Sequence, residues 1–316
     1  MQTDASPCYD PPMDEFNLDP EVRAFIDRYL EVSSLSTATS VAQQRIDYDA
    51  LLRHFRYAHP AGLSSSDDTI EGRHGQIPLR HYRCSGVNDD ALIVFIHGGG
   101  FILGGLDSHD DICAELCART GIDLISIDYR LSPEHFHPAH LDDVEDAFHA
   151  CRHGKAILVG VSAGGTLAAA LCHRLRRHQH KPAGQVLIYP ALGGDCFDLD
   201  AYRDNANAPL LTTDDVLFYR GIRCPNDEIP IRDPEYYPLV ADGFGATPPT
   251  IAFSADIDPL RDDARLYVEK LQGAGVTAEW INEPGLVHDY LRARHVSSRA
   301  GAAFDRICDA IIRLAG

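Results

Sequence analysis

Short apolar runs alternate with helix-like stretches along most of the chain after residue 91. The runs read "ALIVFIH", "DLISIDY", "AILVGVS", "QVLIYP", "PTIAFSAD" and "AEWIN". Helix-like segments such as "HLDDVEDAFHACR" and "DDARLYVEKLQGAG" lie between them. Because strands that alternate with helices form βαβ units, we predict an α/β fold with a mostly parallel central sheet flanked by helices.

The N-terminal region has a different pattern. In "LDPEVRAFIDRYLEV", Asp19 is a candidate N-cap and Pro20 the first helical residue, and "SVAQQRIDYDALLRHF" is typical of a second helix. The alternation in "QIPLRHYRC" predicts one strand before the alternating region.

One segment, at about residues 193–240, interrupts the alternation. It contains Gly, Asp, Asn and Pro clusters and one helix candidate, "TTDDVLFYRGI". Since it is too long for a simple connection between two strands, we interpret it as an insertion lying over the strand ends.

A G-x-S-x-G arrangement ends one of the predicted strands. Gly160, Ser162 and Gly164 lie where the strand-like "AILV" passes into the helix-like "AGGTLAAALCHRLRRH", whose second residue is Gly164. A serine on such a tight turn projects its Oγ clear of the sheet, next to the free N–H groups of a helix N-terminus. Ser162 is therefore a candidate nucleophile.

Three glycines follow His97 at the end of an earlier predicted strand. Acyl-transfer enzymes stabilise an oxyanion with backbone N–H groups, and glycine lets the backbone come close to the substrate. We expect Gly99, Gly100 and Ala163 to supply these donors, and His97 to buttress the loop.

A serine nucleophile needs a base and an orienting carboxylate, in the chain order Ser, Asp or Glu, His for this architecture. The strand "PTIAFSAD" ends among four aspartates, of which Asp258, directly before Pro259, is the first choice and Asp256 the second. His288 follows the "AEWIN" strand in a loop, where the base should lie.

The segments "HGGGF", "DYRLSPEH", "GVSAGG", "DIDPLRD" and "HDY" resemble the hormone-sensitive-lipase-like branch of the α/β-hydrolases, the bacterial esterases with an HGGG loop. The resemblance runs over nearly the whole chain. It implies a single α/β-hydrolase domain over residues 1–316, with a cap formed by about residues 1–50 and 193–240. It also implies Ser162, Asp258 and His288 as catalytic triad and Gly99, Gly100 and Ala163 as oxyanion hole.

The expected pocket is largely apolar, and the candidates for its lining are Phe101, Tyr189, Leu210, Phe218 and Val287. Relatives often form dimers, so a homodimer is an expectation from the resemblance.

Two residues depart from the family pattern. Val161 precedes the serine where most relatives carry Asp or Thr, and Asp289 follows the histidine where most carry Gly. Neither change removes a triad group, and we expect both to act on substrate preference or on the catalytic base, since Asp289 puts a carboxylate beside His288.

Composition excludes several other classes of protein. The net charge of −19 and the lack of a basic run argue against a nucleic-acid partner. The N-terminus does not have the pattern of a signal peptide, and no apolar stretch approaches membrane-spanning length. Nine cysteines without framework spacing indicate free thiols and a cytoplasmic protein. No metal is expected at Cys113 and Cys117 or at the His135, His137 and His140 group.

These observations predict a serine carboxylesterase that acts on small-molecule esters with short to medium acyl chains. No cofactor is implied. Two alternatives stay open: an amidase or peptidase with the same triad, and a non-catalytic binding protein on the same fold.

Overall fold

A computed structural model describes residues 15–36, 40–84, 90–151 and 154–316. In this part of the chain eight strands form one sheet in the order β1-β2-β4-β3-β5-β6-β7-β8. The strands are β1 (Leu63–Gly72), β2 (Gly75–Cys84), β3 (Ala91–Ile96), β4 (Leu124–Ile127), β5 (Lys155–Val161), β6 (Gly184–Ile188), β7 (Thr250–Ile257) and β8 (Ala278–Val287). β2 runs antiparallel to β1 and β4, and the remaining pairs are parallel. The predicted fold class is confirmed.

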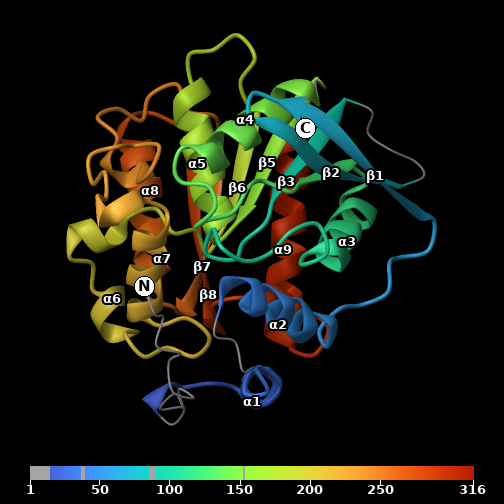
Figure 1. The fold of residues 1–316 in the computed structure, drawn as a ribbon, viewed down its shortest axis with the longest axis vertical. Helices are drawn as coiled ribbons and strands as arrows, with labels where there is room; N and C mark the ends of the chain where they lie inside the picture. The colour runs from blue at the N-terminus through green and yellow to red at the C-terminus, as the bar shows by residue number, and fades with distance from the viewer. Residues whose placement is uncertain (1–14, 37–39, 85–89, 152–153) are drawn as a thin grey trace.

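Helices cover both faces of the sheet, as Figure 1 shows. One core cluster joins the sheet to α1 (Pro20–Ser33), α3 (Asp110–Thr120) and α9 (Ser298–Ala315). The other joins it to α4 (Ala139–Ala150), α5 (Ala163–Leu175) and α8 (Arg261–Gly273). β3 is buried throughout and lies between these two layers of helices. The loop that follows its carboxyl end therefore begins inside the molecule.

β1 is a strand that the sequence pattern did not predict. Its residues are mostly exposed and polar, so the chain has no apolar alternation there. It is nevertheless paired with β2 over its whole length, because the turn between Gly72 and Gly75 folds it back as a hairpin.

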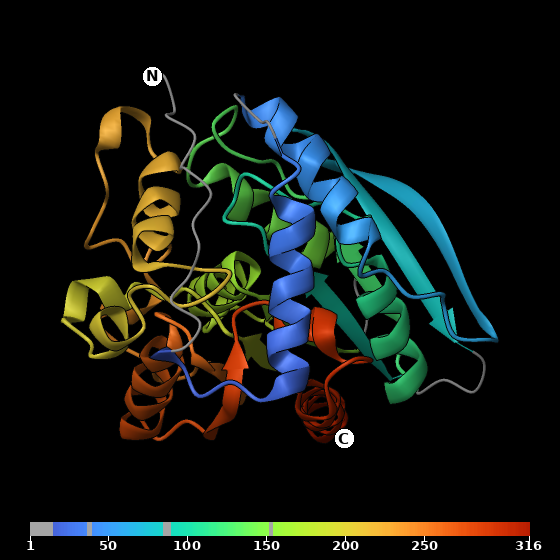
Figure 2. The same cartoon turned by 90° about the horizontal axis from the view of Figure 1, so that it is seen from below.

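Two segments far apart in sequence meet at one end of the molecule. α1 and α2 (Val41–Arg53) lie at the bottom of Figure 1, and α6 (Ala201–Asp204) and α7 (Thr213–Ile222) at the lower left. Figure 2 shows the same elements from below, with α1 and α2 crossing the view. The short 3₁₀ helices are η2 (Gly194–Phe197), η3 (Pro225–Asp227), η4 (Pro238–Val240) and η5 (Tyr290–Ala293).

Local signals explain where these helices begin. Asp19 caps α1 by accepting from the N–H groups of Glu21 and Val22, as the sequence predicted. Thr212 and Asp215 form a reciprocal capping box at the start of α7. The helix candidate in the insertion therefore has its own nucleation signal, although none of its residues is buried.

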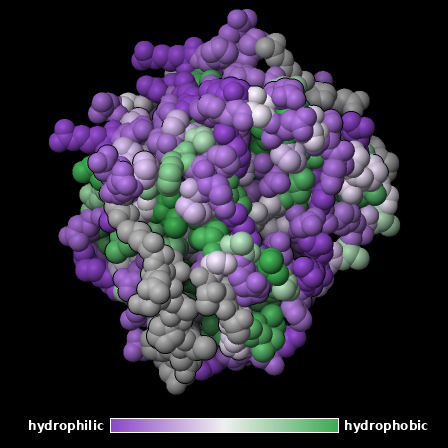
Figure 3. Space-filling model, viewed as in Figure 1, coloured by the Kyte–Doolittle hydropathy of each residue, from purple (hydrophilic) through white to green (hydrophobic). Residues whose placement is uncertain are grey.

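The surface that Figure 3 shows is largely hydrophilic, in keeping with the net charge of −19. Within the described ranges, no helix has the length and apolar character needed to cross a bilayer.

Candidate active site

Ser162 lies on a sharp turn between β5 and α5. Its backbone has φ 53° and ψ −118°, a strained conformation for a residue with a side chain. The turn closes because its neighbours are glycines: a Cβ on Gly164 would lie 2.0 Å from the carbonyl oxygen of Ile96, and one on Gly160 would lie 2.4 Å from that of Gly164. Helix and strands thus come close enough to hold the serine at the end of the sheet.

His288 and Asp258 reach Ser162 from the ends of two neighbouring strands, β8 and β7. His288 Nε2 lies 2.9 Å from Ser162 Oγ, and His288 Nδ1 lies 2.6 Å from Asp258 Oδ2. Asp258 is fully buried and also accepts from the N–H of Leu260 at 2.8 Å. The three side chains form one continuous hydrogen-bonded line.

Asp256, the second choice from the sequence, has another position. Its carboxylate accepts from Asn282 Nδ2 at 2.9 Å and from the N–H of Gly285 at 3.2 Å. It therefore holds the β7–β8 edge together, while Asp258 faces the imidazole. Asn205, which the sequence analysis did not single out, donates to the carbonyl oxygens of both Asp256 and Asp258.

The glycine loop after β3 passes directly beside the serine. Gly99 and Gly100 have φ values of 123° and 60°, which glycine adopts without strain. Within the described part of the chain, no hydrogen bond uses the N–H of Gly99, Gly100 or Ala163. His97 is fully buried, stacks on Tyr129 and lies with Nδ1 2.7 Å from the carbonyl oxygen of Gly98. Burial lowers the pKa of His97 to about 4, so its ring is neutral in the loop.

A cavity of about 130 Å³ opens over Ser162. Gly98, Gly99, Gly100, Ala163 and His288 line it, together with Tyr29 of α1, Tyr48 of α2 and Val216 of α7. The N-terminal helices and the insertion therefore both contribute walls. Val161, one of the two departures from the family pattern, is buried at the end of β5 and also borders the cavity.

The five residues predicted to line the pocket have three different positions. Phe101 and Leu210 form part of the cavity wall. Tyr189 and Val287 are each 1% exposed and lie in the core. The Tyr189 ring packs against the His288 ring, with 4.6 Å between the ring centroids. Phe218 faces an adjacent groove between α7 and the helices α1 and α2.

Two residues of the insertion cover the glycine loop, and the sequence analysis did not name them. The ring of Tyr219 lies against Gly100, where a Cβ would come within 2.4 Å of it. The guanidinium of Arg223 lies 3.8 Å from the centre of the Phe101 ring. In the sequence, only the charged and aromatic residues of "YRGIR" pointed to these positions. The sequence does not specify which of those side chains face the cavity.

Asp289, the other departure, has a left-handed backbone (φ 62°) and borders the cavity next to the histidine. Its carboxylate accepts from Arg292 Nε at 2.7 Å. Arg292 is 3% exposed and also donates to the carbonyl oxygen of Ser108 and to Tyr48 Oη. Asp289 thus neutralises a buried arginine, which a glycine at this position does not do.

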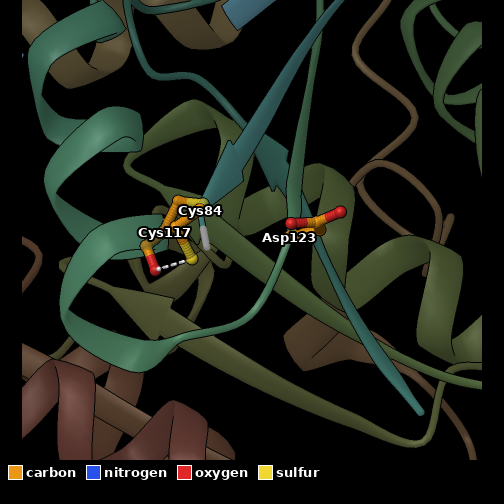
Figure 4. Close-up of side chains that lie close together, drawn as sticks. All are labelled: Cys84, Cys117 and Asp123. Carbon is orange, nitrogen blue, oxygen red and sulfur yellow. Dashed lines mark hydrogen bonds between the residues drawn. The ribbon is translucent and has the colours of Figure 1, made fainter. Parts of the chain in front are cut away.

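Cys84, Cys117 and Asp123 are the described residues whose side chains come close enough to share a metal ion. Figure 4 shows Cys84 and Cys117 side by side, with a hydrogen bond from the Cys84 thiol to the carbonyl oxygen of Cys117. Their ligand atoms lie within 4.8 Å of one another, but three ligands are fewer than the four of a closed zinc site. Burial raises the pKa of Cys117, which disfavours its thiolate.

The chain is similar to proteins that are named as ester hydrolases. Residues 93–292 match the family described as alpha/beta hydrolase fold. Carboxylic ester hydrolase LipN of Mycobacterium tuberculosis is 33% identical over 265 residues, covering 78% of this chain and 69% of that protein. Ethyl acetate hydrolase of Pseudomonas putida is 28% identical over 93% of this chain and 98% of that protein. A solved hyperthermophilic esterase from the archaeon Pyrobaculum calidifontis superposes with a TM-score of 0.84 at 29% identity, covering 94% and 99% of the two chains.

Proposed function

The chain belongs to the α/β-hydrolase fold family, and from this premise we propose that it is a carboxylic ester hydrolase that acts through an acyl-enzyme on Ser162. The observation that carries the proposal is the hydrogen-bonded line Ser162–His288–Asp258 beneath three unused backbone N–H groups. The names of the relatives support ester hydrolysis as the reaction.

In the acylation step, Ser162 Oγ attacks the ester carbonyl and His288 Nε2 takes its proton. Asp258 holds His288 Nδ1–H, which fixes the tautomer that leaves Nε2 free to act as base. The carbonyl oxygen becomes an oxyanion, and the N–H groups of Gly99, Gly100 and Ala163 stabilise it. The tetrahedral intermediate collapses, and the alcohol leaves with the proton from His288.

In the deacylation step, His288 removes a proton from water, which attacks the acyl-enzyme carbonyl. The second tetrahedral intermediate releases the carboxylic acid, and the proton returns to Ser162 Oγ. One water is consumed for each ester, and the residues end in their starting protonation states. No cofactor enters this cycle.

We propose that α1, α2 and the segment at about 193–240 act as a cap that limits the substrate. The cavity of about 130 Å³ is walled by Tyr29, Tyr48 and Tyr219, and such a size favours acyl groups of short to medium length. The cytoplasmic location and a homodimer stay predictions.

The proposal is tested by measuring hydrolysis of p-nitrophenyl esters from acetate to palmitate, with Ser162→Ala as control. We expect turnover that is highest for short to medium chains and lower by several orders of magnitude in Ser162→Ala. Turnover on anilides but not on esters would favour the amidase alternative. Ligand binding with no turnover above the Ser162→Ala control would favour the non-catalytic one.

A further inference from the structure

Arg223 is a buried arginine in the wall of the candidate active-site cavity. It directly follows α7 and is 2% exposed. Its guanidinium lies between two aromatic rings, 3.8 Å from the centre of Phe101 and 4.0 Å from that of Tyr236. Since Phe101 is the next residue after Gly100, this positive charge lies close to the loop that borders the reacting carbonyl.

The Arg223 side chain lacks a carboxylate partner among the described residues. Its Nη1 donates to the carbonyl oxygen of Tyr236 at 3.3 Å, while Nε and Nη2 are buried without any partner. The other arginines of similar burial are paired: Arg292 with Asp289, and Arg294 with Asp111. A buried charge without a partner is strongly destabilising, so this one calls for an explanation.

The unused edge of Arg223 has the shape of a carboxylate receptor. Nε and Nη2 present two parallel N–H groups, the fork that matches both oxygens of a carboxylate. The chain itself uses this edge for that purpose elsewhere: Arg130 binds Asp143, Arg174 binds Glu235 and Arg306 binds Glu283 through Nε and Nη2.

Among the described side chains, no carboxylate neutralises Arg223. Two aspartates line the same cavity, but Asp195 is bound by Arg220 and Asp289 by Arg292, each at 2.7 Å. Burial lowers the pKa of Arg223, in contrast to the raised pKa of Arg292 beside its carboxylate. Among the described residues that line the cavity, Arg223 is therefore a positive charge without a carboxylate partner.

We propose that Arg223 binds a carboxylate group of the substrate, so that the preferred substrates are esters that carry a free carboxylate in addition to the scissile ester. This inference rests on the proposed ester hydrolysis and names its substrate class. Nε and Nη2 are shielded from solvent in the structure, so the proposal requires the Arg223 side chain to turn toward the cavity when the carboxylate binds. The carboxylate belongs either to the acyl half or to the alcohol half, and the test separates the two.

The experiment compares charged esters with neutral isosteres by pH-stat. Ethyl hydrogen succinate, as its monoanion, against ethyl 4-methylpentanoate tests the acyl half, and butyryloxyacetate against isobutyl butyrate tests the alcohol half. We expect kcat/KM for one charged ester to exceed that of its neutral partner by about 10-fold or more. Neutral esters preferred in both pairs would overturn the inference, whereas no turnover of any ester would contradict the proposed function instead.

Variants separate recognition from a structural role of Arg223. Arg223→Met should lower the charged-to-neutral ratio of kcat/KM by about 10-fold or more, and Arg223→Lys should lower it less, because it keeps the charge but not the fork. Arg203→Met removes one exposed charge from the same insertion outside the cavity and should leave the ratio unchanged. Equal losses on charged and neutral esters in Arg223→Met would mean that Arg223 only holds Phe101, and would refute the inference.

Binding to the Ser162→Ala protein gives a readout that does not depend on turnover. By calorimetry, the preferred charged ester should bind this protein about 10-fold more tightly than its neutral partner, and Ser162→Ala/Arg223→Met should lose that difference. Equal affinities in Ser162→Ala would overturn the inference even if Arg223→Met fails to fold.

Discussion

The ring of Tyr219 lies so close to Gly100 that a methyl group on Gly100 would come within 2.4 Å of Tyr219 Cδ1. Tyr219 belongs to the insertion and Gly100 to the loop after β3, so two distant parts of the chain fix the position of one proposed oxyanion donor. The φ of 60° at Gly100 adds a second reason for glycine there.

We therefore expect Gly100→Ala to lower kcat/KM for a neutral p-nitrophenyl ester by about 100-fold, the usual effect of losing one oxyanion donor. Gly243→Ala is the matched control, because a methyl group on Gly243 would have no atom within 4 Å and the residue has no positive φ. Similar activity of the two variants would mean that the loop does not need its observed conformation.

Asp258→Asn should lower kcat by about 10⁴-fold, because the amide no longer holds the imidazole in the tautomer that the reaction needs. The control is Asp256→Asn, since Asp256 contacts Asn282 and Gly285 and not His288. We expect this control to keep kcat within about twofold of the wild type, as substitutions that leave the catalytic line intact usually do. Steady-state kinetics of both variants decide between the two carboxylates, and a larger loss in Asp256→Asn would reverse the assignment.

Asp289→Gly should destabilise the protein although it introduces the glycine that the resemblance to the esterases leads us to expect after the histidine. Removing the left-handed strain at φ 62° is worth about 1 kcal/mol, but an unpaired buried arginine costs about 3–5 kcal/mol. We expect a Tm lower by on the order of 5 °C in scanning calorimetry. Asparagine tolerates this backbone conformation and keeps an acceptor for Arg292. The Tm of Asp289→Asn should therefore lie between those of Asp289→Gly and the wild type. A Tm of Asp289→Gly above the wild type would show that strain outweighs the ion pair.

Stability should decrease in acid because of buried neutral histidines such as His173. His173 is 2% exposed, and burial lowers its pKa from 6.5 to about 4. In the unfolded chain His173 takes up a proton below pH 6.5, whereas in the folded chain it does so only near pH 4. The contribution of the neutral His173 to the free energy of unfolding is therefore complete above pH 6.5 and is lost as the pH falls from 6.5 to about 4. The shift corresponds to about 3 kcal/mol for this one group.

His173→Gln should therefore show a smaller drop in Tm between pH 7 and pH 4.5 than the wild type. Asp128 acts in the opposite direction, since burial raises its pKa to about 6, but it is present in both proteins and cancels in the comparison. An unchanged drop in His173→Gln would show that His173 is not held neutral.

The sequence predicted those parts of the molecule that follow from local chemistry and chain order. The strand–glycine–serine–helix arrangement requires a turn at Ser162 with its Oγ exposed, and parallel strands bring their carboxyl ends to one edge, where Asp258 and His288 then meet. The alternation that predicts strands depends on one buried face, so the exposed β1 gave no signal.

The cavity wall was harder to predict, because it depends on how helices turn over the strand ends. The sequence favoured Phe218, but neighbouring helical residues differ by about 100° in direction, and Tyr219 is the one that faces the loop. Val287 and Tyr189 were also predicted to line the pocket, but both belong to the buried core and do not border the cavity. The stacking of Arg223 on Phe101 joins residues from separate parts of the fold and leaves no local pattern.

Covalent labelling of the nucleophile tests the central claim most directly. The protein is treated with diethyl p-nitrophenyl phosphate, which transfers a phosphoryl group to an activated serine, and is then analysed by mass spectrometry of its peptides. We predict one adduct per chain, located on Ser162, that forms in parallel with the loss of esterase activity and is absent in Ser162→Ala. Full inactivation with the adduct on another residue, or activity that persists once Ser162 is modified, would contradict the account.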